Sequence, residues 1–381
     1  MSSQPNIPVE PMVTSSRRLR EVCRRLRETG VFGFDTEFIR ENSYLPQLCL
    51  IQAATRDFVA IIDPFAVDVG PFWRLVVDSR IEKVVHAGEQ DLEICHAHTH
   101  RAPAGIFDVQ VAAALVGLDY PLSYGNLVLE VIGVETIQGK SFTDWARRPL
   151  SRGQMHYAVE DVQHLVGLRD ALHGRLGALG RLAWMREEMA PAETPATYAF
   201  DSLRALQRIR GWRRLGRQRL AVLRELVTWR ETAARQADLP PRTFLRDAAM
   251  KNVAKQMPRT VRALRQVKGF PRPLARRAGA EVLKTLDLAA RLDEEDWPIA
   301  AGRESDSHDK ALVSRTIDRV REFCLANSLN PALIANRADY VDLLHALRHG
   351  KRPARPLRLT GGWRGAFLGA LVTDMLTGRR K

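Results

Sequence analysis

Two acidic residues, Asp35 and Glu37, lie inside VFGFDTEF, the most strand-like segment near the start of the chain. Side chains alternate between the faces of a strand, so both carboxylates share one face. Two carboxylates this close repel each other unless a cation joins them. Hard divalent ions such as Mg²⁺ take carboxylate oxygens, and two ions about 4 Å apart can stabilise the attacking and leaving oxygens of a phosphodiester. Alone, this D-x-E pattern also fits an acidic pair on an edge strand.

Further acidic residues strengthen the metal hypothesis. Asp91 follows the strand-like KVVH in AGEQDLEI, in the first turn of a predicted helix, where a carboxylate is also expected from dipole compensation. In QMHYAVEDV, Tyr157 and Asp161 are four apart and therefore share a helix face. Tyr157 could orient a metal-bound water while Asp161 binds the metal; the alternative is an amphipathic helix with an exposed acid. Together, D-x-E, D and Y-x-x-x-D form a specific pattern.

An α/β domain of about 180 residues is expected to position these groups. β-rich runs separated by turn residues predict an antiparallel meander of 31–38, 47–53 and 57–63, followed by a strand at 83–86. Apolar spacing predicts helices at 71–78, 90–98, 108–117, 122–132 and 154–176.

The chain beyond residue 200 shows no convincing strand. Apolar residues at helical spacing predict helices at 216–237, 243–256 and 258–267. An acidic, Pro- and Gly-containing stretch at 293–309 reads as a linker, and a second helical block follows to residue 376. We therefore expect four regions, with these boundaries: 1–195, 196–290, the linker 291–309, and 310–381.

Charge differs sharply between the two halves. Residues 1–180 hold 18 Lys/Arg against 22 Asp/Glu, whereas 181–381 hold 40 against 22, and the whole chain carries +14. The segment 203–277 alone has 21 basic and 4 acidic side chains. A dense basic domain commonly binds nucleic acid through phosphate neutralisation, although a solvated helix face is the plainer alternative. The candidate phosphate contacts are Arg213, Arg214, Arg217, Arg219, Lys251, Lys255, Arg259 and Arg262.

The segments FDTEF, HAGEQDLEI and HYAVEDV resemble the three exonuclease motifs of the DEDD superfamily, in its tyrosine-containing branch. YLPQLCLIQ, FDVQVAAALVG, PLSYGNLV and DWARRPLS resemble the ribonuclease D family more specifically. Residues 203–280 resemble the helicase-and-RNase-D C-terminal (HRDC) domain, and 310–376 resemble a second, divergent copy.

This resemblance implies an RNase H-like α/β exonuclease domain with a mixed sheet, followed by two small all-α HRDC-type domains. It implies a 3′→5′ exoribonuclease, a hydrolase of phosphodiester bonds that releases nucleoside 5′-monophosphates, with tRNA precursors as typical substrates. Asp35, Glu37, Asp91 and Asp161 would hold two Mg²⁺ or Mn²⁺ ions, and Tyr157 would position the attacking water. Asp108 lies in a matched segment without an assigned role.

Two other functions stay open. The same metal site could cut DNA, since no residue here reveals a contact to the 2′-hydroxyl. The chain could also be a catalytically silent RNA-binding module, although the intact carboxylate set argues against this.

Several features limit the remaining possibilities. No apolar stretch reaches a membrane span or resembles a secretory signal, and four scattered cysteines suit the cytoplasm. Nothing points to an obligate protein partner; the expected partner is RNA with a free 3′ end.

A zinc site in CHAHTH is disfavoured because alternate histidines at a helix end cannot converge on one ion. We expect His86 to pack at its strand end, and Arg147 and Arg148 are weaker phosphate candidates.

Overall fold

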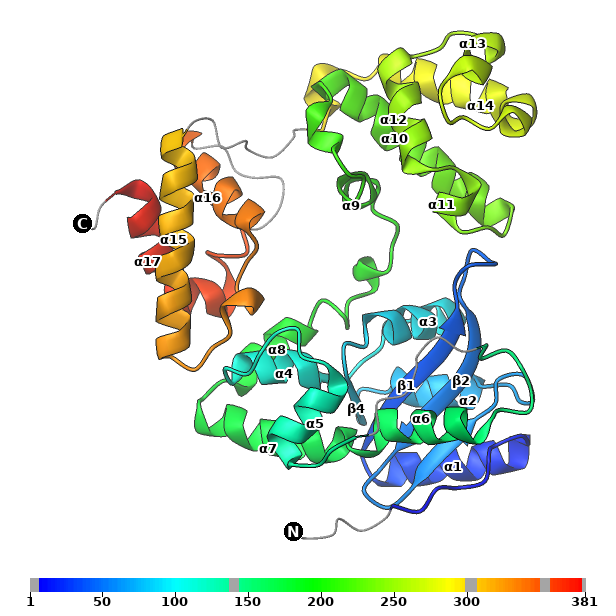
Figure 1. Ribbon diagram of the computed structural model, residues 1–381, viewed down its shortest axis with the longest axis vertical. Helices are drawn as coiled ribbons and strands as arrows, with labels where there is room; N and C mark the ends of the chain where they lie inside the picture. Colours follow the sequence, from blue (N-terminus) through cyan, green and yellow to red (C-terminus); the bar gives the residue numbers. More distant parts are fainter. Residues whose placement is uncertain (1–6, 137–143, 299–306, 350–356, 379–381) are drawn as a thin grey trace. The chain divides into compact units, whose positions relative to one another are not determined.

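The computed structural model describes residues 7–136, 144–298, 307–349 and 357–378 (Figure 1). Its contacts divide them into two compact units. The first unit takes the described parts of 1–38, 48–198 and 302–381, and the second takes 39–47 and 199–301. The loop that connects the first two strands therefore belongs to the second unit, whereas the C-terminal helices belong to the first.

A five-stranded mixed sheet forms the centre of the first unit (Figure 1). The strands are β1 (Val31–Ile39), β2 (Gln47–Ala54), β3 (Val59–Ile62), β4 (Glu82–Val85) and β5 (Ile106–Asp108). Their order is β3-β2-β1-β4-β5. β2 and β3 pair antiparallel, while β4 pairs parallel with both β1 and β5. The α/β class with a mixed sheet is confirmed.

Helices cover both faces of β1. On one face, Phe32 and Phe34 pack edge-on against Phe72 of α2 (Gly70–Val76), with ring centroids 5.9 and 5.8 Å from that of Phe72. On the other face, Gly33 lets α7 (Leu165–Ala178) approach so closely that an added Cβ would lie 2.5 Å from the Cβ of Leu165. The helices of this part are α1 (Ser16–Glu28), α2 (Gly70–Val76), α3 (Glu89–Thr99), α4 (Val109–Leu115), α5 (Tyr124–Ile132), α6 (Arg152–Gln163), α7 (Leu165–Ala178) and α8 (Leu182–Met189).

Several expected helices differ from the structure. The helix expected over 243–256 is divided, because the extended backbone of Leu245 and Arg246 separates Pro241–Phe244 from Asp247–Gln256. The helix expected from residue 108 starts one residue later, because Ile106–Asp108 pairs with β4 and Asp108 caps the helix. The helix expected over 154–176 is interrupted at His164, which separates α6 from α7. The His164 amide donates to the hydroxyl of Tyr124 at 3.2 Å, so a distant side chain takes part in this break.

The C-terminal helices pack on the sheet-containing part of the same unit. They are α15 (Ser307–Ala326), α16 (Arg337–His349) and α17 (Gly362–Thr377), with a short 3₁₀ helix at Pro331–Leu333. The buried guanidinium of Arg181 donates to the carbonyls of Leu115 and Ser328 at 2.7 Å each. α15 begins three residues before the expected domain start, and residues 299–306 of the expected linker lie outside the described ranges.

The second unit is all-helical around its own apolar core. Its helices are α9 (Ser202–Gln207), α10 (Arg217–Gln236), α11 (Pro241–Phe244), α12 (Asp247–Gln256), α13 (Val261–Gln266) and α14 (Arg272–Ala290), with 3₁₀ helices at Trp212–Arg214 and Glu294–Asp296. A further 3₁₀ turn, Pro195–Thr197, precedes this unit. In the β1–β2 loop, the Tyr44 amide donates to Asp238 at 3.0 Å, and the Tyr44 hydroxyl accepts from Arg235 at 2.8 Å.

No helix in the described ranges combines the length and apolar character that a membrane span requires. The domain boundaries at residues 195, 290 and 310 stay a prediction.

Candidate active site

Three carboxylates from β1 and α6 meet at one point of the first unit. Asp35 and Glu37 lie on β1, and Asp161 lies on α6. One carboxylate oxygen from each lies within 4.8 Å of the others. α6 is held at its start by a capping box, in which the Ser151 hydroxyl accepts from the Gln154 amide and the Gln154 side chain accepts from the Ser151 amide. The two acids of the D-x-E pattern and Asp161 on the helix thus lie close together, as expected.

This carboxylate group is electrostatically strained without a cation. Burial raises the pKa of Asp35 well above its usual value, and the charges of Asp91, Asp161 and Glu37 raise it further. Burial, then Asp161 and Asp91, raise the pKa of Glu37 to about 8. Burial likewise raises the pKa of Asp161 to about 7. At neutral pH, several members therefore retain protons unless a positive charge replaces them.

Asp91 stands in the first turn of α3 and lies outside that three-carboxylate group. It is close enough for its charge to raise the pKa of both Asp35 and Glu37. Burial raises the pKa of Asp91 to about 6, although the hydrogen bond from the Thr36 hydroxyl lowers this pKa in part. A fourth carboxylate thus borders the group at a fixed position.

Tyr157 precedes Asp161 by one helical turn, and its hydroxyl hydrogen-bonds to that carboxylate. Burial raises the pKa of Tyr157, as do the charges of Asp161 and Glu37. The phenol therefore stays protonated throughout the physiological range. Its ring lies 6.0 Å from that of Trp145, with the planes tilted by 44°. The hydroxyl is placed to hold a polar molecule beside the carboxylates.

Asp108 is a positioning residue that spacing alone did not reveal. Its buried carboxylate accepts hydrogen bonds from the amides of Ala87 at 3.1 Å, Gly88 at 3.2 Å and Gln110 at 2.8 Å. Ala87 and Gly88 form the turn between β4 and α3, so Asp108 fixes the start of the helix that carries Asp91. The sequence signal was an acid placed between an apolar strand and an Ala-rich helix.

Two more residues near the carboxylates, Thr36 and Tyr124, were not predicted from the sequence. Thr36 is buried between the two acids of β1 and bonds to Asp91. Tyr124 is the first residue of α5. Its hydroxyl accepts a hydrogen bond from the His164 amide, and its ring contacts that of His86 edge-on, with centroids 5.6 Å apart. Neither residue type is unusual in such a segment, so only the tertiary contacts identify them.

The donor set fits a hard divalent cation. It consists of carboxylate oxygens with raised pKa values, and in the described ranges it is the only cluster of His, Cys, Asp or Glu with ligand atoms this close. Oxygen ligands of this kind suit Mg²⁺ and Mn²⁺. The site can therefore bind divalent metal.

His96 and His98 of CHAHTH make packing contacts. The His98 ring stacks on Trp73 at 5.7 Å, and the His96 ring stacks on Tyr198 at 4.6 Å. His86 also packs, as expected, with its Nε2 2.9 Å from the carbonyl oxygen of Leu122.

Arg148 is a structural residue, in contrast to its weak assignment as a phosphate contact. Its guanidinium binds both carboxylate oxygens of Asp63, at 2.8 and 2.9 Å, and donates to the carbonyl of Cys49 at 2.7 Å. These bonds occupy the fork that a phosphate would need. Arg147 is exposed.

The basic candidates of the second unit are divided between two pockets and positions outside these pockets. Arg214, Lys251 and Lys255 line one pocket together with Arg210. Arg262 lines a different pocket, which the helices α13 and α14 form.

The other four basic candidates lie outside both pockets. Arg217 donates to the carbonyl of Glu294 at 2.6 Å and so ties down the 3₁₀ helix there. Arg213 lies over the ring of Trp212, 5.3 Å from its centroid. Arg219 and Arg259 are exposed.

Comparison with known proteins identifies the family of the chain. A family model described as 3′-5′ exonuclease matches residues 11–176, and an HRDC domain model matches residues 219–286. "Ribonuclease D" of Granulibacter bethesdensis is 35% identical, over 96% of this chain and 92% of that protein. "Ribonuclease D" of Sphingobium indicum is also 35% identical, over 97% of this chain and 95% of that protein.

A solved structure shares the whole architecture. Escherichia coli RNase D, described as an exoribonuclease involved in structured RNA processing, superposes with a TM-score of 0.83 at 26% identity, covering 97% of this chain and 99% of that one. Fold, motif-bearing segments and full-length similarity therefore agree, and the chain belongs to the ribonuclease D family of 3′→5′ exoribonucleases.

Proposed function

We propose that the chain hydrolyses RNA from its 3′ end with two divalent ions, Mg²⁺ or Mn²⁺, at the carboxylates of β1, α3 and α6. The observation that carries this proposal is the convergence of Asp35, Glu37 and Asp161 within 4.8 Å, with pKa values raised by burial and mutual repulsion. Two divalent ions carry a charge of +4, equal and opposite to four ionised carboxylates. The proposed ligands are therefore these three residues and Asp91.

Each residue has a distinct role in this proposal. The carboxylates bind the ions, which would neutralise phosphate charge and lower the pKa of the attacking water. The Tyr157 hydroxyl, held against Asp161, orients that water toward the phosphorus. Thr36 and Asp108 keep Asp91 in place from two sides. Residues of β1 between Thr36 and Phe38 receive the terminal 3′-hydroxyl of the substrate.

We further propose tRNA precursors as substrates, trimmed at their 3′ trailers to release nucleoside 5′-monophosphates. The full-length relatives named "Ribonuclease D" and the structured-RNA role given for the Escherichia coli protein support this substrate class. Four cysteines, all free and buried, support function in the reducing cytoplasm. The basic second unit would hold the RNA backbone, since phosphate neutralisation drives such binding.

The test uses matched 3′-labelled RNA and DNA strands, incubated with Mg²⁺ and then with EDTA. We expect mononucleotide release from RNA only, and none in EDTA. Release from DNA would favour a DNA-directed exonuclease, and no release from either strand would indicate a silent RNA-binding module. Far-ultraviolet circular dichroism in EDTA should stay unchanged, because the fold does not depend on the metal; a loss of signal would contradict this.

A further inference from the structure

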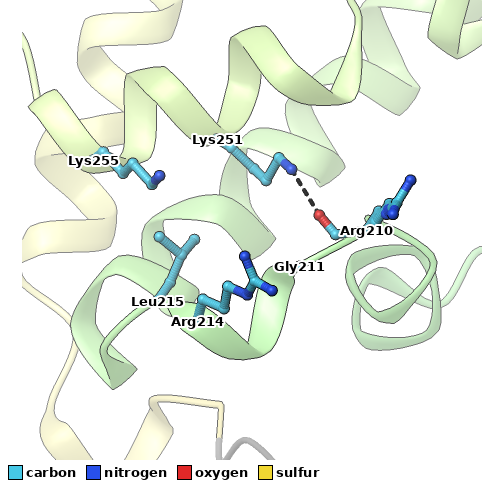
Figure 2. Close-up of a pocket in the computed structure, with 6 residues that line it drawn as sticks. All are labelled: Arg210, Gly211, Arg214, Leu215, Lys251 and Lys255. Carbon is cyan, nitrogen blue, oxygen red and sulfur yellow. Dashed lines mark hydrogen bonds between the residues drawn. The ribbon is translucent and has the colours of Figure 1, made fainter.

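A pocket of about 350 Å³ lies in the second unit, between α12 and the 3₁₀ helix Trp212–Arg214 (Figure 2). Lys251 and Lys255 come from α12, and Arg214 comes from the 3₁₀ helix. The lining residues are Arg210, Gly211, Arg214, Leu215, Lys251 and Lys255. Four of these six residues are cations, and none is an acid.

The positive charge of this pocket is not neutralised within the described protein. The side chains of Arg214 and Lys255 form neither an ion pair nor a hydrogen bond with any residue in the described ranges, and both residues are exposed. Elsewhere in the same unit, arginines do find acids: Arg230 pairs with Asp247 at 2.7 Å, and Arg291 pairs with Asp287 at 2.6 Å. Four cations gathered without a carboxylate repel one another, and an anion between them would remove that repulsion.

Contacts within the protein hold the walls of this pocket in place. The Lys251 ammonium donates to the main-chain carbonyl of Arg210 at 2.6 Å, which joins α12 to the opposite wall (Figure 2). Gly211 bends that wall with a φ of 78°, a conformation that favours glycine. Trp212 and Leu215 are buried and anchor the wall to the core of the unit. The cations therefore stand on a rigid frame.

We propose that this pocket is a discrete phosphate-binding site. The planar fork of Arg214 suits two phosphate oxygens, and the ammonium of Lys255 supplies a compact charge. Arg210 lines the pocket although it is not one of the eight basic candidates, whereas the Arg217 candidate donates to the carbonyl of Glu294 instead. The phosphate can belong to an RNA backbone, in which case the site serves the proposed exonuclease function, or to a free nucleotide.

The test compares a pocket variant with a control of equal charge in the full-length protein. The pocket variant is Arg214→Ala with Lys255→Ala. The control is Lys268→Ala with Lys284→Ala, two exposed cations of the same unit that lie outside both pockets. Both binding measurements use EDTA, which prevents hydrolysis and leaves the carboxylates of the active site unfavourable for phosphate.

The first arm uses adenosine 5′-monophosphate and follows the width of its phosphorus resonance. The second arm uses a 12-nucleotide single-stranded RNA and follows fluorescence anisotropy over a range of salt. If the phosphate belongs to RNA, the pocket variant should bind RNA at least about tenfold more weakly, with a salt slope smaller by about 1.4 for two lost contacts. If it belongs to a free nucleotide, the pocket variant should abolish the line broadening and keep its RNA affinity.

Either result supports the site, and the affected arm identifies the source of the phosphate. Losses equal to those of the control in both arms, or no loss in either, would overturn the proposal. Hydrolysis with Mg²⁺ separates this inference from the proposed function. If the pocket does not bind phosphate, the unsubstituted protein should still hydrolyse RNA. If the protein does not hydrolyse RNA, phosphate binding in EDTA should still be measurable.

Discussion

The hydroxyl of Thr36 on β1 donates a hydrogen bond to the carboxylate of Asp91 on α3, although 55 positions separate the two residues. Both side chains are buried. Thr36 stands between Asp35 and Glu37, so one strand supplies two carboxylates of the proposed metal site and orients another. The bond therefore connects the FDTEF motif on β1 directly to the HAGEQDLEI motif on α3.

Substituting Thr36→Val removes this bond and keeps the shape of the side chain. Asp91 then loses a group that lowers its pKa and fixes its orientation. We expect the Mg²⁺ concentration for half-maximal activity to rise about tenfold or more, the usual cost of losing a partner behind a metal ligand. Activity at saturating Mg²⁺ should fall less. Thr285→Val is the control, because that hydroxyl donates only to the Glu281 carbonyl within α14. An unchanged Mg²⁺ requirement would show that Asp91 needs no orientation from Thr36.

Substituting Asp35→Asn should lower the rate of hydrolysis by orders of magnitude, because the carboxylate at the centre of the repulsion is lost. The metal-free protein should nevertheless melt at an equal or higher temperature, because the remaining acids then repel less. Mg²⁺ should stabilise this variant less than the unsubstituted protein. Thermal unfolding in EDTA and in Mg²⁺ measures both effects. Asp57→Asn, at an exposed turn, is the control and should behave as the unsubstituted chain does. A near-normal rate for Asp35→Asn would refute the assignment.

Tyr157→Phe separates orientation of water from binding of metal. The substitution removes the hydroxyl that bonds to Asp161 and leaves every carboxylate. We expect the rate to fall by about tenfold to a hundredfold, less than for Asp35→Asn, with a nearly unchanged Mg²⁺ requirement. Single-turnover hydrolysis at several Mg²⁺ concentrations distinguishes the two effects. A large rise in the Mg²⁺ requirement would mean that the hydroxyl serves mainly to hold Asp161.

The raised pKa values predict a specific pH dependence. Burial raises the pKa of Asp91 to about 6, that of Asp161 to about 7 and that of Glu37 to about 8. In the unfolded chain these groups titrate near 4, so the metal-free folded state binds more protons, and its stability falls as pH rises from about 4 to 8. Metal must displace these protons, so Mg²⁺ affinity should increase with pH across 6 to 8.

Calorimetric titration with Mg²⁺ in buffers of different ionisation enthalpy measures the protons released. We expect net release at pH 6.5 and less at pH 8.5. The melting temperature in EDTA should fall between pH 5 and 8, and Mg²⁺ should raise it more at pH 8 than at pH 6. A Mg²⁺ affinity independent of pH would contradict raised pKa values at the metal site.

The sequence predicts the parts of the site that depend on local periodicity. Alternation along β1 placed Asp35 and Glu37 together, and the four-residue spacing placed Tyr157 beside Asp161, as the structure shows. The break at His164 was not predictable, because the hydroxyl involved belongs to Tyr124, 40 residues earlier. β5 has only three residues, too few for a periodic signal, and is recognised only by its pairing with β4.

The placement of the C-terminal helices was equally beyond the sequence. Helical spacing and the resemblance predicted a second HRDC-type helical domain at 310–381, and the contacts place α15, α16 and α17 in one compact unit with the exonuclease part. The decisive groups are main-chain carbonyls, at Leu115 and Ser328, which accept from one guanidinium. Every residue has a main-chain carbonyl, so the pattern of residue types in the sequence cannot indicate which two carbonyls bind Arg181.

Substituting Arg181→Ala tests whether this docking stabilises the catalytic unit. The guanidinium is buried and donates to three main-chain carbonyls, and its loss would leave those acceptors unpaired. We expect the free energy of unfolding to fall by about 3 kcal/mol, within the range for breaking a buried charged hydrogen-bond network. Urea unfolding of the full-length chain measures the change. Arg186→Ala, an exposed arginine on α8, is the matched control and should change the free energy by less than about 0.5 kcal/mol. Equal losses in both variants would show that the C-terminal helices do not depend on this contact.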